Sequence, residues 1–431
     1  MTTTLRTAGA SPLDTHHPAD GPASRCRFCG DALRHTVVDL GMSPLCESYL
    51  RAEQLDGGEV FYPLHVRVCD SCFLVQLHEY VPPAEIFTEY AYFSSYAESW
   101  VRHAYDYTEA MIERFGLTDQ HLVAEVASND GYLLQHFVAR GIPVLGIEPA
   151  ANVAEAAVAR GVPTVVDFFG TALARSLAAE RKQADLVAAN NVLAQVPDLN
   201  DFVGGLRILL TRDGVVTVEF PHLMRLIDEN QFDTIYHEHF SYFSFETACA
   251  IFDAHGLRVF DVEELATHGG SLRLYACRQE SARHESSARV DELVRRERAA
   301  GYRTLEPYSG FGARVEETKR TLLEFLIAAR RDGLSVAGYG APGKGNTLLN
   351  YCGIRSDFLD YTVDRNPYKQ GLFLPGTHIP IFAPEKLAET RPDVILVLPW
   401  NLRHEIADQL SYTKQWGAKL VVAIPALAVL E

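Results

Sequence analysis

Two Cys-x-x-C pairs near the start of the chain constrain its fold more than any other feature. Cys26 and Cys29 form the first pair, Cys69 and Cys72 form the second, and 39 residues separate Cys29 from Cys69. Each tight turn offers two thiolates to one ion, so two turns complete the tetrahedral shell of a closed, structural zinc site. The intervening segment is expected to fold as a small β-rich unit that returns to the metal. Disulfides and a coincidental spacing are the alternatives, but the chain shows no apolar signal segment, and the cytoplasm keeps thiols reduced.

Composition sets the outer limits of what the chain can do. Its 431 residues carry 39 basic and 56 acidic side chains, a net charge of −17, which opposes nucleic acid as the main partner. The length is consistent with roughly three domains. No apolar run approaches the ~18 residues of a membrane span, so a cytoplasmic protein without a membrane partner is expected. The remaining cysteines are interpreted as small buried hydrophobes without a role: Cys46, Cys249, Cys277 and Cys352.

The segment after residue 120 alternates apolar runs with helical stretches, which is typical of β-α-β units and a mostly parallel sheet. A first strand over 121–127 ends in the loop Ser-Asn-Asp-Gly at 128–131, and a second strand over 143–147 ends in Glu148. An acid at the tip of the second strand accepts hydrogen bonds from ribose hydroxyls. The loop holds Asn129 and Gly131 but lacks the Gly-x-Gly-x-x-Gly phosphate cradle. This pattern suits a nucleoside without a pyrophosphate, such as S-adenosylmethionine.

Later strands complete the pattern of a class I methyltransferase, a parallel sheet closed by an antiparallel hairpin. They are predicted at 185–189, 215–220, 257–264 and 271–277. Asp167 and Phe168 fall where the third strand ends, suitable for binding the adenine amino group and stacking on its ring. Asn190 and Asn191 end the fourth strand.

Two segments concentrate polar and aromatic side chains. Residues 86–112 are rich in tyrosine and tryptophan and are expected to be a linking helix that is mostly core. Residues 234–242, Thr-Ile-Tyr-His-Glu-His-Phe-Ser-Tyr, place two histidines at i and i+2 around Glu238. That spacing does not fit a His-Glu-x-x-His metal site. A general base beside an acid that orients it is the better interpretation, and a polar helix start is the alternative.

The last hundred residues form another α/β pattern. A strand opening at 334 leads into Gly338-Tyr-Gly-Ala-Pro-Gly-Lys-Gly345, a glycine-rich turn before a helix, with further strands at 360–363 and 394–398. Such a turn can bind phosphate, which keeps an NAD-linked oxidoreductase open. Because no redox residue is evident in this domain, it is more readily interpreted as holding the nucleotide half of a substrate.

Taken together, the ordered motifs resemble those of the nucleotide-sugar C-methyltransferases of deoxysugar biosynthesis. The motifs include YAYFSSYAESW, EVASNDGYLL, GIEPA, ANNVLAQVPD, IYHEHFSYFS, HGGSLRLY, GYGAPGKGNTLLNY and LPWN. The resemblance implies a zinc-binding domain (25–85), a Rossmann-like S-adenosylmethionine domain with its aromatic linker helix (86–282) and a C-terminal Rossmann-like domain (333–431). The residue pattern adds a disordered tail (1–24), which has no periodicity, and a charged helical connection (283–332). It implies C-methylation of a dTDP-linked 4-keto-6-deoxy sugar, next to the ketone at C-3 or C-5, in antibiotic or other natural-product biosynthesis.

The resemblance also implies site residues. His239 is the expected base, and the other expected catalytic residues are Glu238, Tyr236, Tyr92 and His237. The expected cofactor residues are Ser95, Asn129, Gly131, Glu148, Asp167, Phe168 and Asn190, and those for the substrate are Asn191, Gln195 and Lys344. Gln195 departs from the family, which has histidine there, and glutamine cannot carry a proton at neutral pH. Methylation on oxygen or nitrogen, and a zinc-knuckle binding protein without methyl transfer, stay open as alternatives, and the sequence does not indicate an oligomeric state.

Overall fold

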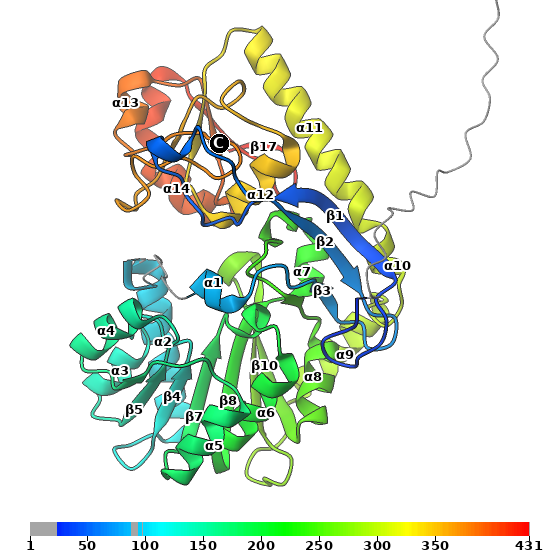
Figure 1. Cartoon of the computed structure of the whole chain (residues 1–431), viewed down its shortest axis with the longest axis vertical. Coiled ribbons are helices and arrows are strands. Elements are labelled where there is room, and N and C mark those ends of the chain that lie inside the picture. The colour runs from blue at the N-terminus through cyan, green and yellow to red at the C-terminus, as the bar shows by residue number, and fades with distance from the viewer. Residues whose placement is uncertain (1–23, 88–93, 97, 431) are drawn as a thin grey trace, which may run out of the picture.

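The computed structural model describes residues 24–430 except 88–93 and 97. Figure 1 shows two lobes, with the central methyltransferase-like sheet below and the C-terminal domain above, and an N-terminal sheet along one side of both. The tail expected over 1–24 falls, apart from Ser24, outside the described residues.

The N-terminal sheet is antiparallel and has the order β1-β2-β3-β9. Its strands are β1 (His35–Ser43), β2 (Tyr62–Val68), β3 (Val75–Leu77) and β9 (Ser241–Tyr242). Along β2 every second residue is buried, which is the period-2 pattern of a sheet with one apolar face. β1 and β2 pair between the two cysteine turns, as the sequence predicts. Because β9 belongs to the central part of the chain, this sheet joins the two units.

The central sheet has the order β10-β11-β8-β7-β4-β5-β6. Neighbouring strands are parallel except for β11, which is antiparallel to both β8 and β10. The strands are β4 (Val123–Val126), β5 (Val144–Ile147), β6 (Thr164–Val165), β7 (Ala184–Asn190), β8 (Leu210–Pro221), β10 (Leu257–Leu265) and β11 (Ser271–Arg278). This arrangement confirms the predicted class I methyltransferase fold.

Helices cover both faces of the central sheet (Figure 1). They are α2 (Glu98–Phe115), α3 (Leu134–Ala139), α4 (Ala151–Ala159), α5 (Thr171–Ala179), α6 (Leu199–Leu209) and α8 (Phe245–Ala254). Two short helices, α1 (Pro83–Phe87) and α7 (Leu223–Asp228), lie between the lobes. Side-chain caps fix where two of them begin: Asp198 accepts from the Asp201 amide before α6, and Ser244 accepts from the Thr247 amide before α8.

The C-terminal sheet has the Rossmann order β14-β13-β12-β15-β16-β17, parallel except for β17. Its strands are β12 (Val336–Tyr339), β13 (Thr362–Val363), β14 (Ile381–Phe382), β15 (Val394–Val397), β16 (Lys419–Val422) and β17 (Ala428–Leu430). Its helices are α12 (Gly343–Cys352), α13 (Lys386–Thr390) and α14 (Arg403–Gln409). Gly353 ends α12 in the left-handed region, at φ +72°.

Three helices connect the two lobes: α9 (Ala288–Ala299), α10 (Glu306–Ser309) and α11 (Phe311–Arg331). The long helix α11 packs on β1, as Figure 1 shows. One apolar cluster contains Val66 of β2, Leu322 of α11 and Val336 of β12. The N-terminal sheet therefore shares a hydrophobic core with the C-terminal domain.

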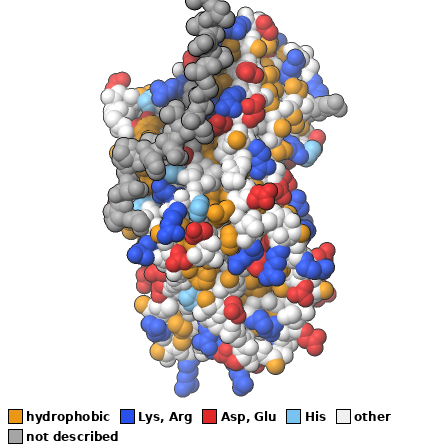
Figure 2. All heavy atoms as spheres, turned by 90° about the vertical axis from the view of Figure 1, so that its right-hand side faces the viewer, with side chains coloured by type: hydrophobic (Ala, Val, Ile, Leu, Met, Phe, Trp, Pro, Cys, Tyr) orange, Lys and Arg blue, Asp and Glu red, His pale blue; other side chains and the backbone are white. Residues whose placement is uncertain are grey.

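Charged side chains of both signs are interspersed over the face drawn in Figure 2. On α11, for example, Arg320 pairs with Glu316 and Glu317. None of the helices in the described part of the chain combines the length and apolarity needed to cross a membrane.

Candidate active site

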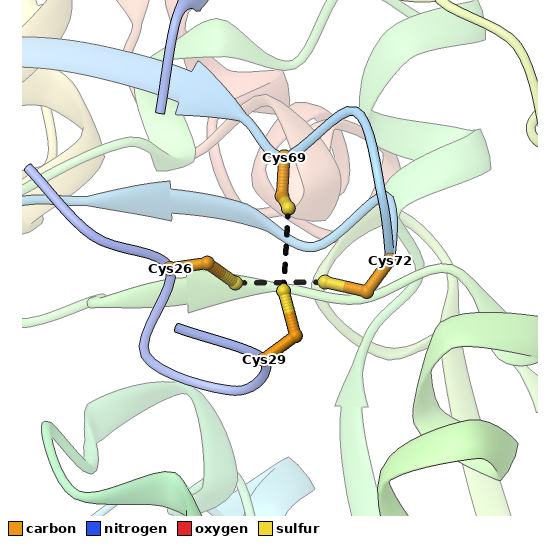
Figure 3. A group of neighbouring side chains, drawn as sticks. All are labelled: Cys26, Cys29, Cys69 and Cys72. Atoms are coloured by element: carbon orange, nitrogen blue, oxygen red, sulfur yellow. Dashed lines mark hydrogen bonds between the residues drawn. The ribbon is translucent and has the colours of Figure 1, made fainter. Parts of the chain in front are cut away.

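The four cysteines converge as the sequence predicts (Figure 3). Their sulfur atoms all lie within 4.8 Å of one another, with 3.5 Å between Cys26 and Cys72 and between Cys29 and Cys69. A tetrahedral zinc ion with bonds of ~2.3 Å sets its sulfurs ~3.8 Å apart, whereas a disulfide needs ~2.05 Å. The four thiols are free and fit the ion. All four ligand positions are filled by protein, so the metal there would be structural.

A cavity of about 760 Å³ lies where the two lobes and the N-terminal unit meet. Its walls come from the carboxyl ends of β4, β5 and β7, from the loop before β9, from the first turn of α12 and from the segment after β1. Its volume is within the range of ligand-binding pockets. Of the predicted site residues, it is lined by Asn129, Glu148, Asp167, Phe168, Asn190, Asn191, Gln195, Tyr236, Glu238, His239 and Lys344.

The end of the cavity at β4 and β5 has the features of a nucleoside site. Glu148 accepts hydrogen bonds from the backbone amides of Asn129 and Ala150, both at 2.9 Å. Burial raises the pKa of this carboxyl, and the two amide bonds oppose that effect. Phe168 is 46% exposed as a residue, although large aromatic side chains are usually covered. A carboxylate held from behind and an uncovered ring fit the ribose and adenine of S-adenosylmethionine.

Asn190 and Asn191 carry polar atoms that the protein leaves unpaired. Within the described chain, Oδ1 of Asn190 and both side-chain amide atoms of Asn191 are buried without a hydrogen-bond partner. Asn191 lies in the left-handed region at φ +56°, a conformation that asparagine tolerates better than most residues. Buried unpaired amides cost free energy, so these two side chains are suited to hold a polar ligand.

The loop before β9 presents His239 and Tyr236 to the cavity. Nδ1 of His239 lies 3.1 Å from the carbonyl oxygen of Thr234. Because a carbonyl only accepts, Nδ1 carries the proton and Nε2 can act as a base. The rings of Tyr236 and His239 are 4.1 Å apart between centroids. Burial lowers the pKa of His239 to about 4, so the imidazole is neutral at pH 7.

Glu238 lines the cavity as a buried acid. Its Oε1 lies 3.8 Å from Sγ of Cys46. Burial, with the nearby Glu47 adding to it, raises the pKa of Glu238 to about 8. The carboxyl is therefore largely protonated at pH 7 and can donate a hydrogen bond.

The structure places some predicted residues outside the cavity. His237 turns the opposite way from His239: its Nε2 is 3.3 Å from the Pro63 carbonyl oxygen, and its ring packs against those of Tyr62 and Tyr80. Tyr236, Glu238 and His239 of this loop line the cavity whereas His237 does not, a difference that the i, i+2 spacing does not reveal.

Ser95 and Gly131 also do not line the cavity. The Ser95 hydroxyl donates to the Asp130 carboxylate, behind the loop that follows β4. Gly131 lies at φ +76°, and a Cβ there would come within 3.0 Å of Val162, so its role is to let the backbone pass. Tyr92 lies outside the described residues.

Sequence reasoning missed several cavity residues. Cys46, interpreted as a small buried hydrophobe without a role, is buried, and it lies in the cavity lining beside Glu47. Trp100 and His268 also line the cavity, with their rings 5.3 Å apart. The sequence signals His268 only by its place in the His-Gly-Gly turn. In the structure, His268 lies at φ +55°, where histidine is uncommon.

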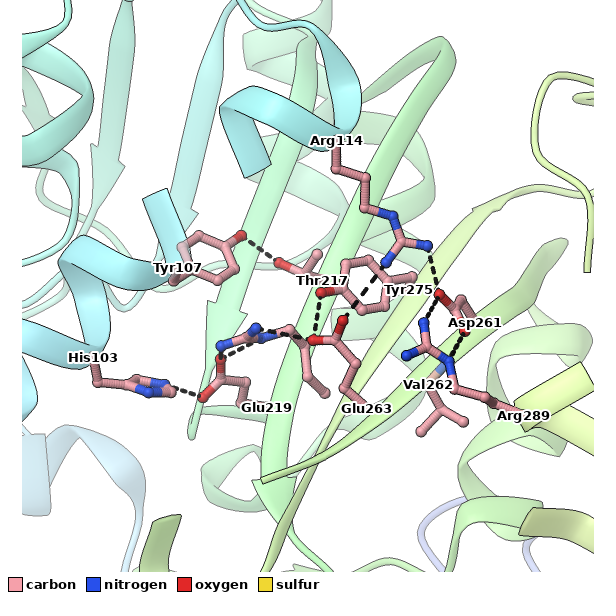
Figure 4. Close-up of polar contacts among 11 residues, drawn as sticks. His103, Tyr107, Arg114, Thr217, Glu219, Asp261, Val262, Glu263, Tyr275 and Arg289 are labelled. Atoms are coloured by element: carbon pink, nitrogen blue, oxygen red, sulfur yellow. Dashed lines mark hydrogen bonds and ion pairs between the residues drawn. The ribbon is translucent and has the colours of Figure 1, made fainter. Parts of the chain in front are cut away.

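A polar network stiffens the wall behind Trp100, which stacks on His103 at 5.0 Å. Nε2 of His103 lies 2.9 Å from Glu219, and Arg273 lies 2.6 Å from the other oxygen of that carboxylate. Burial raises the pKa of Glu219, but the contacts with His103 and Arg273 outweigh burial and hold this pKa below its usual range. Figure 4 shows how this network ties α2 to strands β8, β10 and β11.

The glycine-rich turn before α12 lines the cavity and has protein carboxylates beside it. The Ala341 amide donates to Asp364 at 2.7 Å, and a Cβ on Gly343 would meet Sγ of Cys46 at 2.8 Å and Oε1 of Glu47 at 3.2 Å. Two protein carboxylates, those of Asp364 and Glu47, therefore lie beside this turn. A phosphate site at this turn stays a prediction.

Family models match three consecutive parts of the chain. They describe a zinc binding domain over residues 26–87, a methyltransferase domain over 101–262 and a C-methyltransferase C-terminal domain over 266–425. The chain is 39% identical over 410 residues to C-methyltransferase NovU of Streptomyces niveus. The aligned region covers 95% of this chain and 97% of that protein.

Two solved methyltransferase structures each match about two fifths of the chain. Magnesium protoporphyrin IX methyltransferase of Synechocystis PCC 6803 with bound S-adenosylmethionine has 16% identity and a TM-score of 0.32, and the match covers 42% of this chain and 82% of that one. A methyltransferase of Anabaena variabilis ATCC 29413 has 14% identity and a TM-score of 0.33, covering 40% and 83%.

Proposed function

Because the chain belongs to the C-methyltransferase family and depends on S-adenosylmethionine, we propose that its acceptor is a dTDP-linked 4-keto-6-deoxy sugar. The methyl group is added to a carbon next to the ketone, C-3 or C-5, during the biosynthesis of a natural product. The chain carries a zinc-binding domain, and its zinc is structural in this proposal.

The observation that carries this proposal is that one cavity contains both His239, with Nε2 unprotonated, and Glu148, at the nucleoside end. A carbon acceptor must lose a proton before it becomes a nucleophile, so the enzyme needs a neutral base near the methyl donor. An oxygen or nitrogen acceptor already has a lone pair, so it often depends less on prior removal of a proton by a base. The paired placement therefore favours carbon as the acceptor atom.

The chain's own residues divide the work as follows. His239 removes the proton on the carbon next to the ketone, and its imidazolium is stabilised by the hydrogen bond from Nδ1 to Thr234. Tyr236 lies against the His239 ring and restricts its rotation. Glu238, as a protonated acid, donates a hydrogen bond to a sugar oxygen. When bound, S-adenosylmethionine supplies the methyl group to the carbon and keeps the electron pair of its broken sulfur–carbon bond.

Asn190 and Asn191 supply polar contacts to the ligands, because their buried amide atoms have no partner in the described chain. Gln195 lines the same wall. Its amide can donate and accept hydrogen bonds but cannot exchange a proton, so His239 is the base in this proposal and Gln195 a contact to the sugar.

An NAD-linked oxidoreductase is less well supported. The amide of Ala341 is bonded to Asp364, and Glu47 lies against Gly343, so two carboxylates beside the glycine-rich turn oppose the binding of a pyrophosphate there.

The test is incubation of the purified protein with S-adenosylmethionine carrying a ¹³C-methyl group and a panel of dTDP-4-keto-6-deoxy sugars. We expect a product whose labelled methyl is bonded to carbon, seen by its chemical shift and its couplings to the ring. A methyl group on oxygen or nitrogen, or no product with any sugar of the panel, would contradict the proposal.

A further inference from the structure

Lys344 is the one basic side chain among the described residues that line the cavity. The acidic lining residues are Glu47, Glu148, Asp167, Asp198, Asp201 and Glu238. A nucleoside diphosphate carries at least two negative charges and is usually held by several cations or by a free helix N-terminus. The nearby Lys369 does not line the cavity and is paired with Glu47 at 3.2 Å, and the Ala341 amide is bonded to Asp364, so Lys344 is the cation that this wall offers to a ligand. A single ammonium suits a group that develops one negative charge.

The C-terminal domain holds the Lys344 ammonium in a defined position. Nζ donates to Oδ1 of Asn401 at 2.8 Å and lies 4.9 Å from the centre of the Trp400 ring. The Trp400 indole in turn donates to Asp233 at 2.7 Å. Burial lowers the pKa of Lys344, and the charge of Asp233 opposes that effect. A long lysine side chain that is fixed in this way loses little further freedom when it binds a ligand.

Lys344 lines the same cavity as His239 and His268. Burial is the main reason for the low pKa of His239, and the Lys344 charge lowers it further. Burial and the Lys344 charge also lower the pKa of His268, and His239 lowers it further. The turn that carries His268 packs on Trp400: a Cβ on Gly269 would lie 2.5 Å from that indole. The cation therefore lies near the proposed base, on the part of the cavity wall that the C-terminal domain supplies.

We propose that Lys344 is a catalytic residue that hydrogen bonds to the ketone oxygen of the acceptor and stabilises the negative charge that forms there. This inference rests on the proposed function. As His239 takes the α-proton, the carbon–hydrogen electron pair becomes the carbon–carbon double bond, and the carbonyl π pair moves onto oxygen beside the ammonium. The electron pair then returns through the double bond to make the new carbon–carbon bond, and the ketone is restored. Lys344 keeps its proton throughout, and the imidazolium of His239 releases the α-proton to water.

The experiment compares wild type with Lys344→Met in two measurements. The first is exchange of the sugar's α-proton with deuterated water, followed by NMR with S-adenosylhomocysteine in place of the methyl donor. Removing one oxyanion donor typically costs ~10²–10³-fold in rate, so we expect a loss of that size. The second is the affinity for dTDP alone, by calorimetry. We expect it to change by less than about threefold, whereas losing a charged contact to the diphosphate would weaken it ~10- to 150-fold.

Two further variants sharpen the comparison. Lys344→Gln keeps one donor without the charge, and its exchange rate should lie between those of wild type and Lys344→Met. Lys386→Met is the matched control, because Lys386 pairs with Glu389 on the surface of α13, away from the cavity lining. It should behave as wild type in both measurements.

The possible outcomes separate the two claims. If wild type exchanges the α-proton and Lys344→Met does so equally fast, the inference is overturned and the proposed function stands. A loss of dTDP affinity of tenfold or more in Lys344→Met also overturns it, in favour of a diphosphate contact. If wild type exchanges no sugar of the panel, the proposed function fails, and this inference fails with it.

Discussion

Arg27, between the first two cysteines, donates a hydrogen bond at 3.1 Å to the carbonyl oxygen of Pro197, on the rim of the cavity. A second contact runs the other way: the Asn200 amide donates to the carbonyl oxygens of Arg27 and Phe28 at 3.1 Å. The first cysteine turn is therefore built into the wall of the central domain, near the start of α6. Loss of the metal should disturb this rim as well as the N-terminal sheet.

Zinc removal should lower stability and loosen the cavity together. We expect one zinc ion per chain by elemental analysis. Cys69→Ser should lower the free energy of unfolding by more than the ~1 kcal/mol typical of a point substitution, because a ligand of a closed site is lost. Cys249→Ser, a cysteine outside the cluster, is the control in thermal unfolding. Protein that is free of zinc and fully stable would refute the structural site.

Glu148→Ala should weaken S-adenosylmethionine binding. A charge-assisted hydrogen bond is worth ~1.5–3 kcal/mol, so calorimetry should show a dissociation constant ~10- to 150-fold higher. The dissociation constant of Glu148→Gln should lie between those of wild type and Glu148→Ala, because its amide oxygen can still accept from one of the two backbone amides that hold Glu148. Glu180→Ala, at an exposed position after α5, is the control. An unchanged constant in Glu148→Ala would remove this residue from the site.

His239→Asn and His237→Asn form a matched pair, two residues apart in one loop. General base catalysis typically supplies ~10²–10⁴-fold, so His239→Asn should reduce turnover by about that factor and leave cofactor affinity nearly unchanged. His237 packs on Tyr62 and Tyr80 outside the cavity, so its variant should lose stability with little change in turnover per folded molecule. The reverse result would assign the base to the wrong histidine.

Glu238→Gln should change how stability depends on pH. The pKa of Glu238 is raised to about 8 in the folded chain, so between pH ~4.5 and ~8 the folded state binds the extra proton. The stabilisation from this group is complete below pH ~4.5 and is lost as pH rises through that window, at up to ~1.4 kcal/mol per pH unit. Glutamine does not titrate. Urea unfolding between pH 5 and 7.5 should therefore give a less steeply falling curve for the variant, and parallel curves would contradict the raised pKa.

The sequence by itself determined the elements whose pattern is local. Cys26, Cys29, Cys69 and Cys72 could be paired because their spacing leaves few chemical explanations, and the four sulfurs do converge. Apolar runs located the strands of the central sheet. Since parallel strands gather their carboxyl ends at one edge, Glu148 and Asn190 could be expected to share a cavity, as they do.

Only the tertiary structure decided which side chains meet across the units. Cys46, His239 and Lys344 are separated by roughly a hundred residues or more from one another, and no periodicity relates them. They line one cavity because α11 and the N-terminal sheet share a core with the C-terminal domain. Likewise, His237 and His239 have the same residue type in one loop, but the hydrogen bond to Thr234 and the packing on Tyr62 turn them to opposite sides. Such choices depend on partners that are distant in sequence, which local pattern does not encode.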